Sequence, residues 1–197
     1  MRIPAAQPRQ RHSAQPKRNN RTAKRLRPFP SMLTQLREQF AYNRWANVRL
    51  LGACEPLSNE NLVRELGGSF PSVWLTLAHL YAAENSWLAR WQGTPSGRKP
   101  DLDGIDTVAG LRSKWDALWQ RQTDFLAATS DADVRRVIPV VLMSGMRLDQ
   151  QLGATMRHCA NHSTYHRGQV TNFLRMLGAP TVPLDLALYY DEYPPAD

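Results

Sequence analysis

The side chains in this chain that are best suited to chemistry are histidines. His158, His162 and His166 follow one another at intervals of four residues, and His79 lies in an apolar stretch much earlier. On a helix, residues four apart are separated by about 40° around the axis and about 6 Å along it. Two imidazoles at that spacing can therefore bind one metal ion. His158 and His166 are about 12 Å apart by the same helical rise, too far to share a tetrahedral ion easily.

The spacing leaves two adjacent pairs open as chelates, either His158 with His162 or His162 with His166. The third ligand must come from another segment, and His79 is the remaining histidine that falls within an expected helix. A single histidine among apolar neighbours is more often an ordinary core residue than a ligand. Burying three imidazoles without partners would, however, be costly in unmet hydrogen bonds, and a metal ion removes that cost. From the residues alone, ligation and a core role are about equally favoured.

A site of three imidazoles leaves at least one coordination position for water or substrate. This openness is typical of catalytic rather than structural zinc sites, and imidazole also suits Ni, Cu and Fe. An ion held in this way can lower the pKa of a bound water or hold a thiolate. We therefore expect one divalent transition metal, with Zn and Ni as the first candidates.

Four long amphipathic segments must position these histidines. Apolar residues recur every three or four positions from about Met32 to Cys54, from Ser69 or Ser72 to Trp91, from Thr107 to Thr129, and from about Gln150 to Leu177. Gly178, followed by Pro180, ends the last segment. Four such segments with short links predict an all-α protein, a four-helix bundle.

Two shorter stretches differ from this pattern. Residues 135–149 contain two runs of strand-prone side chains around Ser144-Gly145, which predicts a small β-hairpin or extended crossover before the last helix. Residues 184–190 are expected to form one final turn before a Pro-rich end.

The charge of the chain is concentrated at its N-terminus. The net charge is +8, but residues 1–31 hold nine of the 25 basic side chains and no Asp or Glu. The remainder is close to neutral. With only two cysteines, Cys54 and Cys159, and no apolar run of about 20 residues, we expect no disulfide framework and no membrane span. A reducing cytoplasm is the expected location.

Residues 1–31 have no hydrophobic periodicity and are expected to be disordered. Two main interpretations are open, a solvated basic arm that touches RNA or an acidic partner, or a chain whose true start is Met32. The second is favoured because the charge run lacks the aromatic residues on which bases stack. An organelle transit peptide is a third and less favoured interpretation. Binding of nucleic acid is therefore not expected of the folded part.

Three segments resemble motifs of the DinB-like family, a family of metal-binding four-helix bundles. The run Asn161–Gln169, NHSTYHRGQ, is similar to the family signature, and YNRWAN at 42–47 and LAHL at 77–80 resemble its motifs in the first two helices. The resemblance covers about residues 32–190 and leaves 1–31 and a tail at 191–197 outside. It implies an up-down-down-up bundle and a start at Met32.

The same resemblance assigns the ligands to His79, His162 and His166. It moves His158 to the wall of the site, where we expect it to be half-buried. Ligating imidazoles usually donate their second N–H to an oxygen, and other polar residues near a site can fix its helices. The candidates for such supporting roles are Tyr42, Asn43, Glu84, Arg167 and Gln169.

The resemblance also implies a class of reaction, since this superfamily includes transferases and isomerases that use the metal to hold a low-molecular-weight thiol. Our first hypothesis is a metal-dependent enzyme, transferase or hydrolase-like, and most specifically a thiol transferase acting on electrophilic small molecules. The second is a metal-binding stress-response protein without turnover, and the third a nucleic-acid-associated protein that uses the basic tail. A homodimer is compatible with this type of bundle. The sequence leaves the metal, the substrate and the presence of catalysis open.

Overall fold

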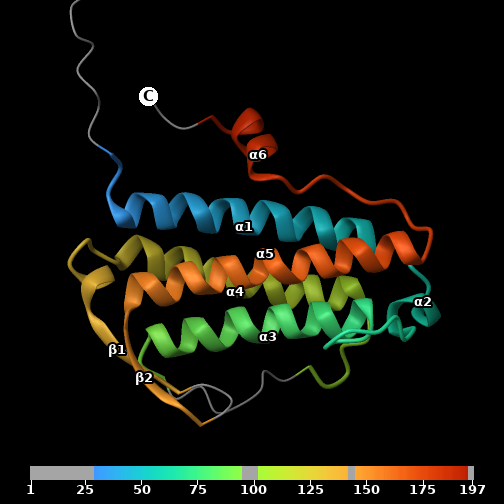
Figure 1. Ribbon diagram of the computed structural model, residues 1–197, viewed down its shortest axis with the longest axis horizontal. Coiled ribbons are helices and arrows are strands. Elements are labelled where there is room, and N and C mark those ends of the chain that lie inside the picture. The colour runs from blue at the N-terminus through green and yellow to red at the C-terminus, as the bar shows by residue number, and fades with distance from the viewer. Residues whose placement is uncertain (1–28, 95–101, 142–144, 195–197) are drawn as a thin grey trace, which may run out of the picture.

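The structure is a computed structural model that describes residues 29–94, 102–141 and 145–194 (Figure 1). Most of the expected N-terminal extension therefore lies outside the described residues, as do Ser144 of the expected hairpin turn and the last three residues of the C-terminal tail.

Four long helices form the bundle: α1 (Met32–Cys54), α3 (Val73–Trp91), α4 (Val108–Ala128) and α5 (Leu152–Met176). In Figure 1, α1 and α5 run in one direction, and α3 and α4 run in the other. This is the up-down-down-up order, and the predicted all-α bundle is confirmed. Helix α5 packs along both α1 and α3, which places His162 and His166 of α5 opposite His79 of α3.

Short polar side chains begin three of these helices. Their hydroxyl oxygens accept hydrogen bonds from backbone N–H groups of the first turn, which have no partner within the helix. The pairs are Ser31 with Thr34 at 3.3 Å, Ser72 with Leu75 at 3.1 Å and Thr107 with Gly110 at 3.1 Å. Of the two starts expected for this helix, Ser69 or Ser72, the structure uses Ser72 as the N-cap.

The predicted hairpin is present and joins α4 to α5. Strands β1 (Val137–Val141) and β2 (Arg147–Gln151) pair antiparallel, with Val137 opposite Gln151, after a short 3₁₀ turn η1 (Asp133–Arg135). Helix α5 begins at Leu152, two residues later than expected, because Gln150 and Gln151 pair with β1. The backbone N–H of Leu152 donates to the Arg136 carbonyl at 2.8 Å, which attaches the start of α5 to the hairpin.

Two short helices flank the bundle. Helix α2 (Asn59–Val63) lies in the connection between α1 and α3, and α6 (Leu186–Glu192) lies beside α1 (Figure 1). Helix α6 takes the place of the single turn expected at 184–190 and continues past residue 190. The indole N–H of Trp45 holds it by donating to Glu192 Oε2 at 2.9 Å.

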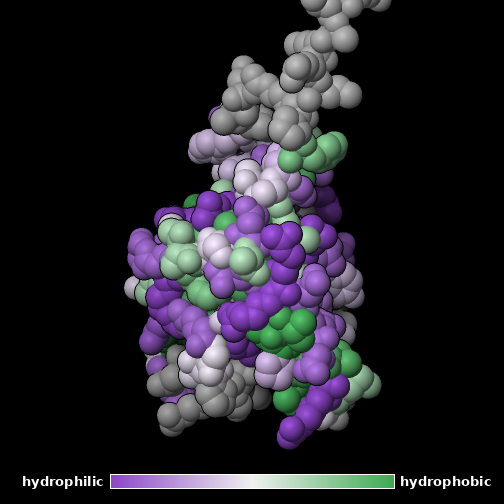
Figure 2. All heavy atoms as spheres, turned by 90° about the vertical axis from the view of Figure 1, so that its left-hand side faces the viewer, coloured by the Kyte–Doolittle hydropathy of each residue, from purple (hydrophilic) through white to green (hydrophobic). Residues whose placement is uncertain are grey.

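The core contains four of the six tryptophans. Trp91, Trp115 and Trp119 are each at most 2% exposed, and Trp87 is 8% exposed. Trp45 and Trp74 are only half-buried because they lie at the edge of the bundle. Hydrophilic residues dominate the end of the bundle seen in Figure 2, with small apolar areas between them. No helix in the described ranges has the length and apolar character needed to cross a membrane.

Candidate metal centre

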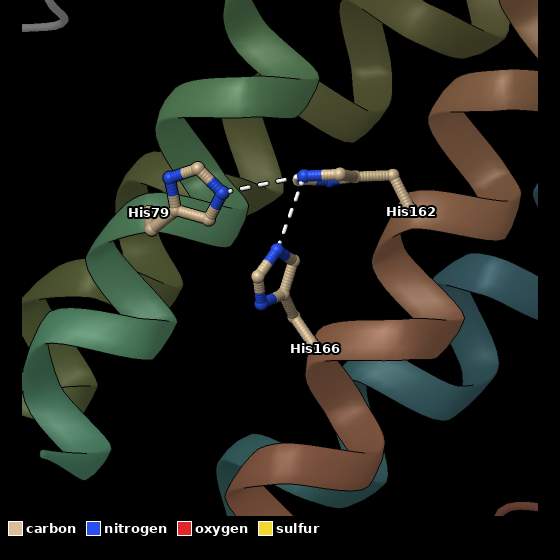
Figure 3. Close-up of side chains that lie close together, drawn as sticks. All are labelled: His79, His162 and His166. Atoms are coloured by element: carbon tan, nitrogen blue, oxygen red, sulfur yellow. Dashed lines mark hydrogen bonds between the residues drawn. The ribbon is translucent and has the colours of Figure 1, made fainter. Parts of the chain in front are cut away.

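Three of the histidines converge between α3 and α5. His79 comes from the second turn of α3, and His162 and His166 lie one turn apart on α5, with all three rings turned toward a common point (Figure 3). The Nε2 atom of His162 lies 3.3 Å from Nε2 of His79 and 3.1 Å from Nε2 of His166. One nitrogen from each ring lies within 4.8 Å of the others. The structure thus brings together the three histidines that the resemblance implies as ligands.

His158 stands apart from this cluster. Its side chain is exposed, whereas we expected it to be half-buried, because it lies one turn before His162 where α5 faces solvent. Its ring packs edge-on against Trp87, with 5.2 Å between centroids. Its centroid is also 5.9 Å from that of His162, at the wall of the cluster. Tertiary packing therefore selects the His162/His166 pair, which the spacing alone left equal to His158/His162.

Gln169 fixes the orientation of one imidazole. Its side-chain oxygen lies 2.7 Å from Nδ1 of His166. Because an amide oxygen can only accept, Nδ1 of His166 donates and Nε2 presents its lone pair to the cluster. This is the arrangement in which a metal-binding histidine is usually held. Nδ1 of His162, by contrast, is buried and has no partner among the described residues.

Burial favours the neutral form of two of the three histidines, His79 and His162. It lowers the pKa of His79 to about 4, with His166 as a second cause, since two positive charges would repel. Burial also lowers the pKa of His162 to about 4, and the neighbouring His166, His79 and His158 act in the same direction. Both imidazoles are therefore neutral at pH 7. Neutral imidazole is the form that binds metal.

Two aromatic rings cover the cluster. Phe70 stacks on His79 with 3.9 Å between centroids and meets His166 edge-on at 5.6 Å. Tyr165 meets His166 edge-on at 5.1 Å. Neither Phe70 nor Tyr165 was predicted from the sequence to lie at the site. Tyr165 lies inside the signature run, but Phe70 reaches the site only because the connection before α3 folds back, and no spacing pattern signals this.

Next to the histidines lies a buried polar network around Glu84. Its carboxylate has no solvent exposure. Five donors surround it, and their bonds to its two oxygens measure between 2.8 and 3.4 Å: Asn43, Asn47 and Ser163 on Oε1, and Trp115 and Gln122 on Oε2. Five donors and no acceptor indicate an ionised carboxylate.

Arg167 supplies the opposite charge, at 2% exposure. Its guanidinium donates to the side-chain oxygens of Asn43 and Asn47 and, at 2.7 Å, to Thr164. The two asparagines thus bridge the buried carboxylate and the buried guanidinium. The Tyr42 ring lies 5.3 Å from the guanidinium carbon, and its hydroxyl donates to the Leu184 carbonyl at 2.7 Å.

The candidate supporting residues therefore separate into two groups. Gln169 bonds directly to a histidine of the cluster. Tyr42, Asn43, Glu84 and Arg167 contact one another instead and tie α1, α3 and α5 together beside it. Other members of this network were not predicted from the sequence as supporting residues, namely Asn47, Ser163, Thr164, Trp115 and Gln122. The available signal was a polar residue at a helical position that should face the core, such as Asn47 four residues after Asn43.

Comparison with known proteins shows the family of this chain and two proteins that it resembles. The sequence matches the DinB family over residues 32–195. The chain belongs to the DinB family. It is similar to Protein DinB of Bacillus subtilis strain 168, with 25% identity over 160 residues that cover 76% of this chain and 90% of that protein. Its fold resembles the crystal structure of a DinB-like protein from Bacillus cereus ATCC 10987, with a TM-score of 0.55 and 17% identity over 76% of this chain and 97% of that one.

The two nitrogen separations that involve His162 match those expected around a single divalent ion. Zn–N bonds of about 2.05 Å place tetrahedral ligand nitrogens about 3.3 Å apart, and octahedral geometry with similar bonds brings them to about 3.0 Å. The observed separations of 3.3 and 3.1 Å fall in this range. Lone pairs this close repel one another unless a proton or a cation lies between them. The three histidines are thus compatible with metal binding.

Proposed function

We propose that His79, His162 and His166 bind one divalent transition metal, Zn or Ni, at a site that stays open to a further ligand. The observation that carries this proposal is the convergence of three Nε2 atoms, with 3.1 and 3.3 Å between neighbours. It is supported by the neutral state of His79 and His162 and by the bond from His166 to Gln169. Structural sites usually have four protein ligands, whereas three histidines are typical of reactive sites.

We further propose that the protein is a thiol transferase of the cytoplasm that acts on electrophilic small molecules. The ion would supply Lewis acidity and hold a thiol as thiolate. The chain itself supplies no such nucleophile from its two cysteines, because both are buried. Burial raises the pKa of Cys54 to about 12 and that of Cys159 well above its usual value. Since only the thiolate attacks, the reacting thiol must be a separate low-molecular-weight molecule.

Metal analysis tests the first part of the proposal. The purified protein should carry about one equivalent of Zn or Ni, which a chelator removes and which either ion restores. His79→Ala and His166→Ala should each lose most of this metal, and the melting temperature should fall toward that of the metal-free protein, because a ligand bound only to the folded state stabilises it. Unchanged metal content and melting temperature in His166→Ala would overturn the assignment.

Conjugation assays test the second part. The Zn- or Ni-loaded protein is incubated with bacillithiol, mycothiol or glutathione and with 1-chloro-2,4-dinitrobenzene as a model electrophile. We expect metal-dependent product with at least one thiol and none in His166→Ala. If the metal is bound but no thiol is conjugated, the transferase is rejected in favour of a metal-binding protein without turnover.

A further inference from the structure

A cavity of about 480 Å³ lies beside the histidine cluster, between residues 66–70 and the C-terminal half of α5. Three of its lining residues also contact the cluster. Phe70 stacks on His79, Tyr165 meets His166 edge-on, and Gln169 accepts from His166. The cavity and the cluster are therefore neighbours, and the side chains of Phe70, Tyr165 and Gln169 lie between them.

The lining has a clear chemical character. Its apolar surface comes from Leu66, Phe70, Tyr165, Phe173 and Met176, and its polar groups are the uncharged side chains of Ser69, Gln169 and Asn172. No Asp, Glu, Lys, Arg or His is among the described residues that line it. A mostly apolar cavity with a few hydrogen-bonding groups is typical of a small-molecule site, and its volume is within the usual range. An anion or cation placed here would be desolvated without a partner of opposite charge, which is unfavourable.

The backbone around the cavity keeps it open. Gly67 and Gly68 have φ angles of +89° and +86°, which side-chain-bearing residues rarely adopt, and the Leu66 N–H closes the loop on the Pro71 carbonyl at 2.6 Å. Gly168 of α5 lines the opposite wall. A Cβ atom there would meet nothing within 4 Å, so the absence of a side chain leaves space.

We propose that this cavity binds the uncharged, apolar body of the small molecule on which the metal centre acts. This inference deepens the proposed function and rests on it for the reaction. The binding of the molecule does not depend on the proposed function, because the cavity is formed by side chains that are not metal ligands. Phe70, Tyr165 and Gln169 then connect the bound body to the histidine cluster. The substrate class is a neutral aromatic or aliphatic electrophile rather than a charged metabolite.

The first test measures binding of two probes of similar size, neutral 2-methoxynaphthalene and anionic naphthalene-2-sulfonate, by equilibrium dialysis with metal-free and Zn-loaded protein. We expect the neutral probe to bind at least tenfold more tightly. Gly168→Phe should fill the cavity and weaken its binding at least tenfold, while Gly52→Phe should not. Gly52 is the matched control because it is an exposed helical glycine with equally open space around its Cβ.

The second variant, Met176→Arg, guards against a folding defect in Gly168→Phe. Met176 is 55% exposed at the edge of the cavity, so the new charge can be tolerated there. Met176→Arg should shift the binding preference of the cavity toward the anionic naphthalene-2-sulfonate. Equal binding of the neutral probe by wild type and Gly168→Phe, with unchanged circular dichroism, would overturn the inference, as would tighter binding of the sulfonate to wild type. Metal content of the wild-type samples separates the two proposals. Wild type that takes up metal but does not bind the neutral probe contradicts the cavity proposal alone. Wild type that binds the neutral probe but takes up no added Zn contradicts the metal-centre proposal alone.

Discussion

The Ser163 hydroxyl donates to Glu84 Oε1 at 2.9 Å and so joins the two helices that carry the histidine cluster. Ser163 follows His162 directly on α5, and Glu84 lies five residues after His79 on α3. Consecutive helical residues point about 100° apart. The bond between Ser163 and Glu84 therefore turns His162 toward the cluster. Arg167 directly follows His166, and its bonds to Asn43 and Asn47 orient His166 in the same way. The buried polar network sets the rotation of α5 on which the site depends.

Removing the carboxylate at the centre of this network should strongly destabilise the folded protein. Glu84→Ala leaves five buried donors without their acceptor and the buried Arg167 without its opposite charge, and we expect a loss of about 3–5 kcal/mol in the free energy of unfolding. Urea denaturation measures it. Asp116→Ala, an exposed position on α4, is the control and should change stability by no more than about 0.5 kcal/mol. A loss in Glu84→Ala no larger than in the control would show that the network does not hold the bundle.

The bond between Gln169 and His166 should tune metal affinity. Gln169→Ala removes the acceptor that fixes the His166 ring, and loss of such a partner typically weakens metal binding about 10–100-fold. Gln169→Glu keeps an acceptor and should retain most of the affinity. Competition with a chromophoric chelator gives the dissociation constants. Asn172→Ala, close by but not bonded to a histidine, should bind metal like wild type, and equal affinity in all four proteins would contradict the role of Gln169.

His158 and His166 should respond differently to the same substitution. His158 is exposed and its ring packs on Trp87, so His158→Ala should leave metal stoichiometry unchanged. His166→Ala should abolish it. Elemental analysis of both variants, purified in parallel, decides between the two chelates that the spacing allows. Loss of metal in His158→Ala with retention in His166→Ala would reverse the assignment.

The stability of the metal-free protein should depend on pH in a defined window. Burial lowers the pKa of His79 and His162 to about 4, from 6.5 in the unfolded chain. Between pH 4 and 6.5 the unfolded chain therefore binds more protons than the folded protein, and the free energy of unfolding rises with pH. Above about pH 7 both states are neutral at these residues, and their contribution is constant.

Melting temperatures of chelator-treated protein from pH 3.5 to 8 measure this dependence. The double variant His79→Gln/His162→Gln should show a shallower rise over the same window, since only these two titrations are removed while the carboxylates remain. Identical slopes in the variant and the wild type would show that the histidines are not held neutral by burial.

Much of the architecture followed from the sequence because it depends on local rules. Hydrophobic periodicity predicted four long helices, and strand-prone residues predicted the hairpin before the last helix. Boundaries set by pairing with a distant segment were less accurate. The start of α5 moved to Leu152 because β2 pairs with β1 through Gln151, and helical spacing carries no information about that partner.

The sequence by itself determined which side chains could bind a metal and that His162 belongs to either possible pair, because helical geometry fixes the distance between residues four apart. It could not choose between His158 and His166, nor show that Glu84 and Arg167 bond to asparagines rather than to histidines. Only the tertiary structure decided these points. The position of α5 along α3 and its rotation about its own axis are set by contacts between residues about 80 positions apart. Those contacts place His166 opposite His79 and leave His158 exposed to solvent.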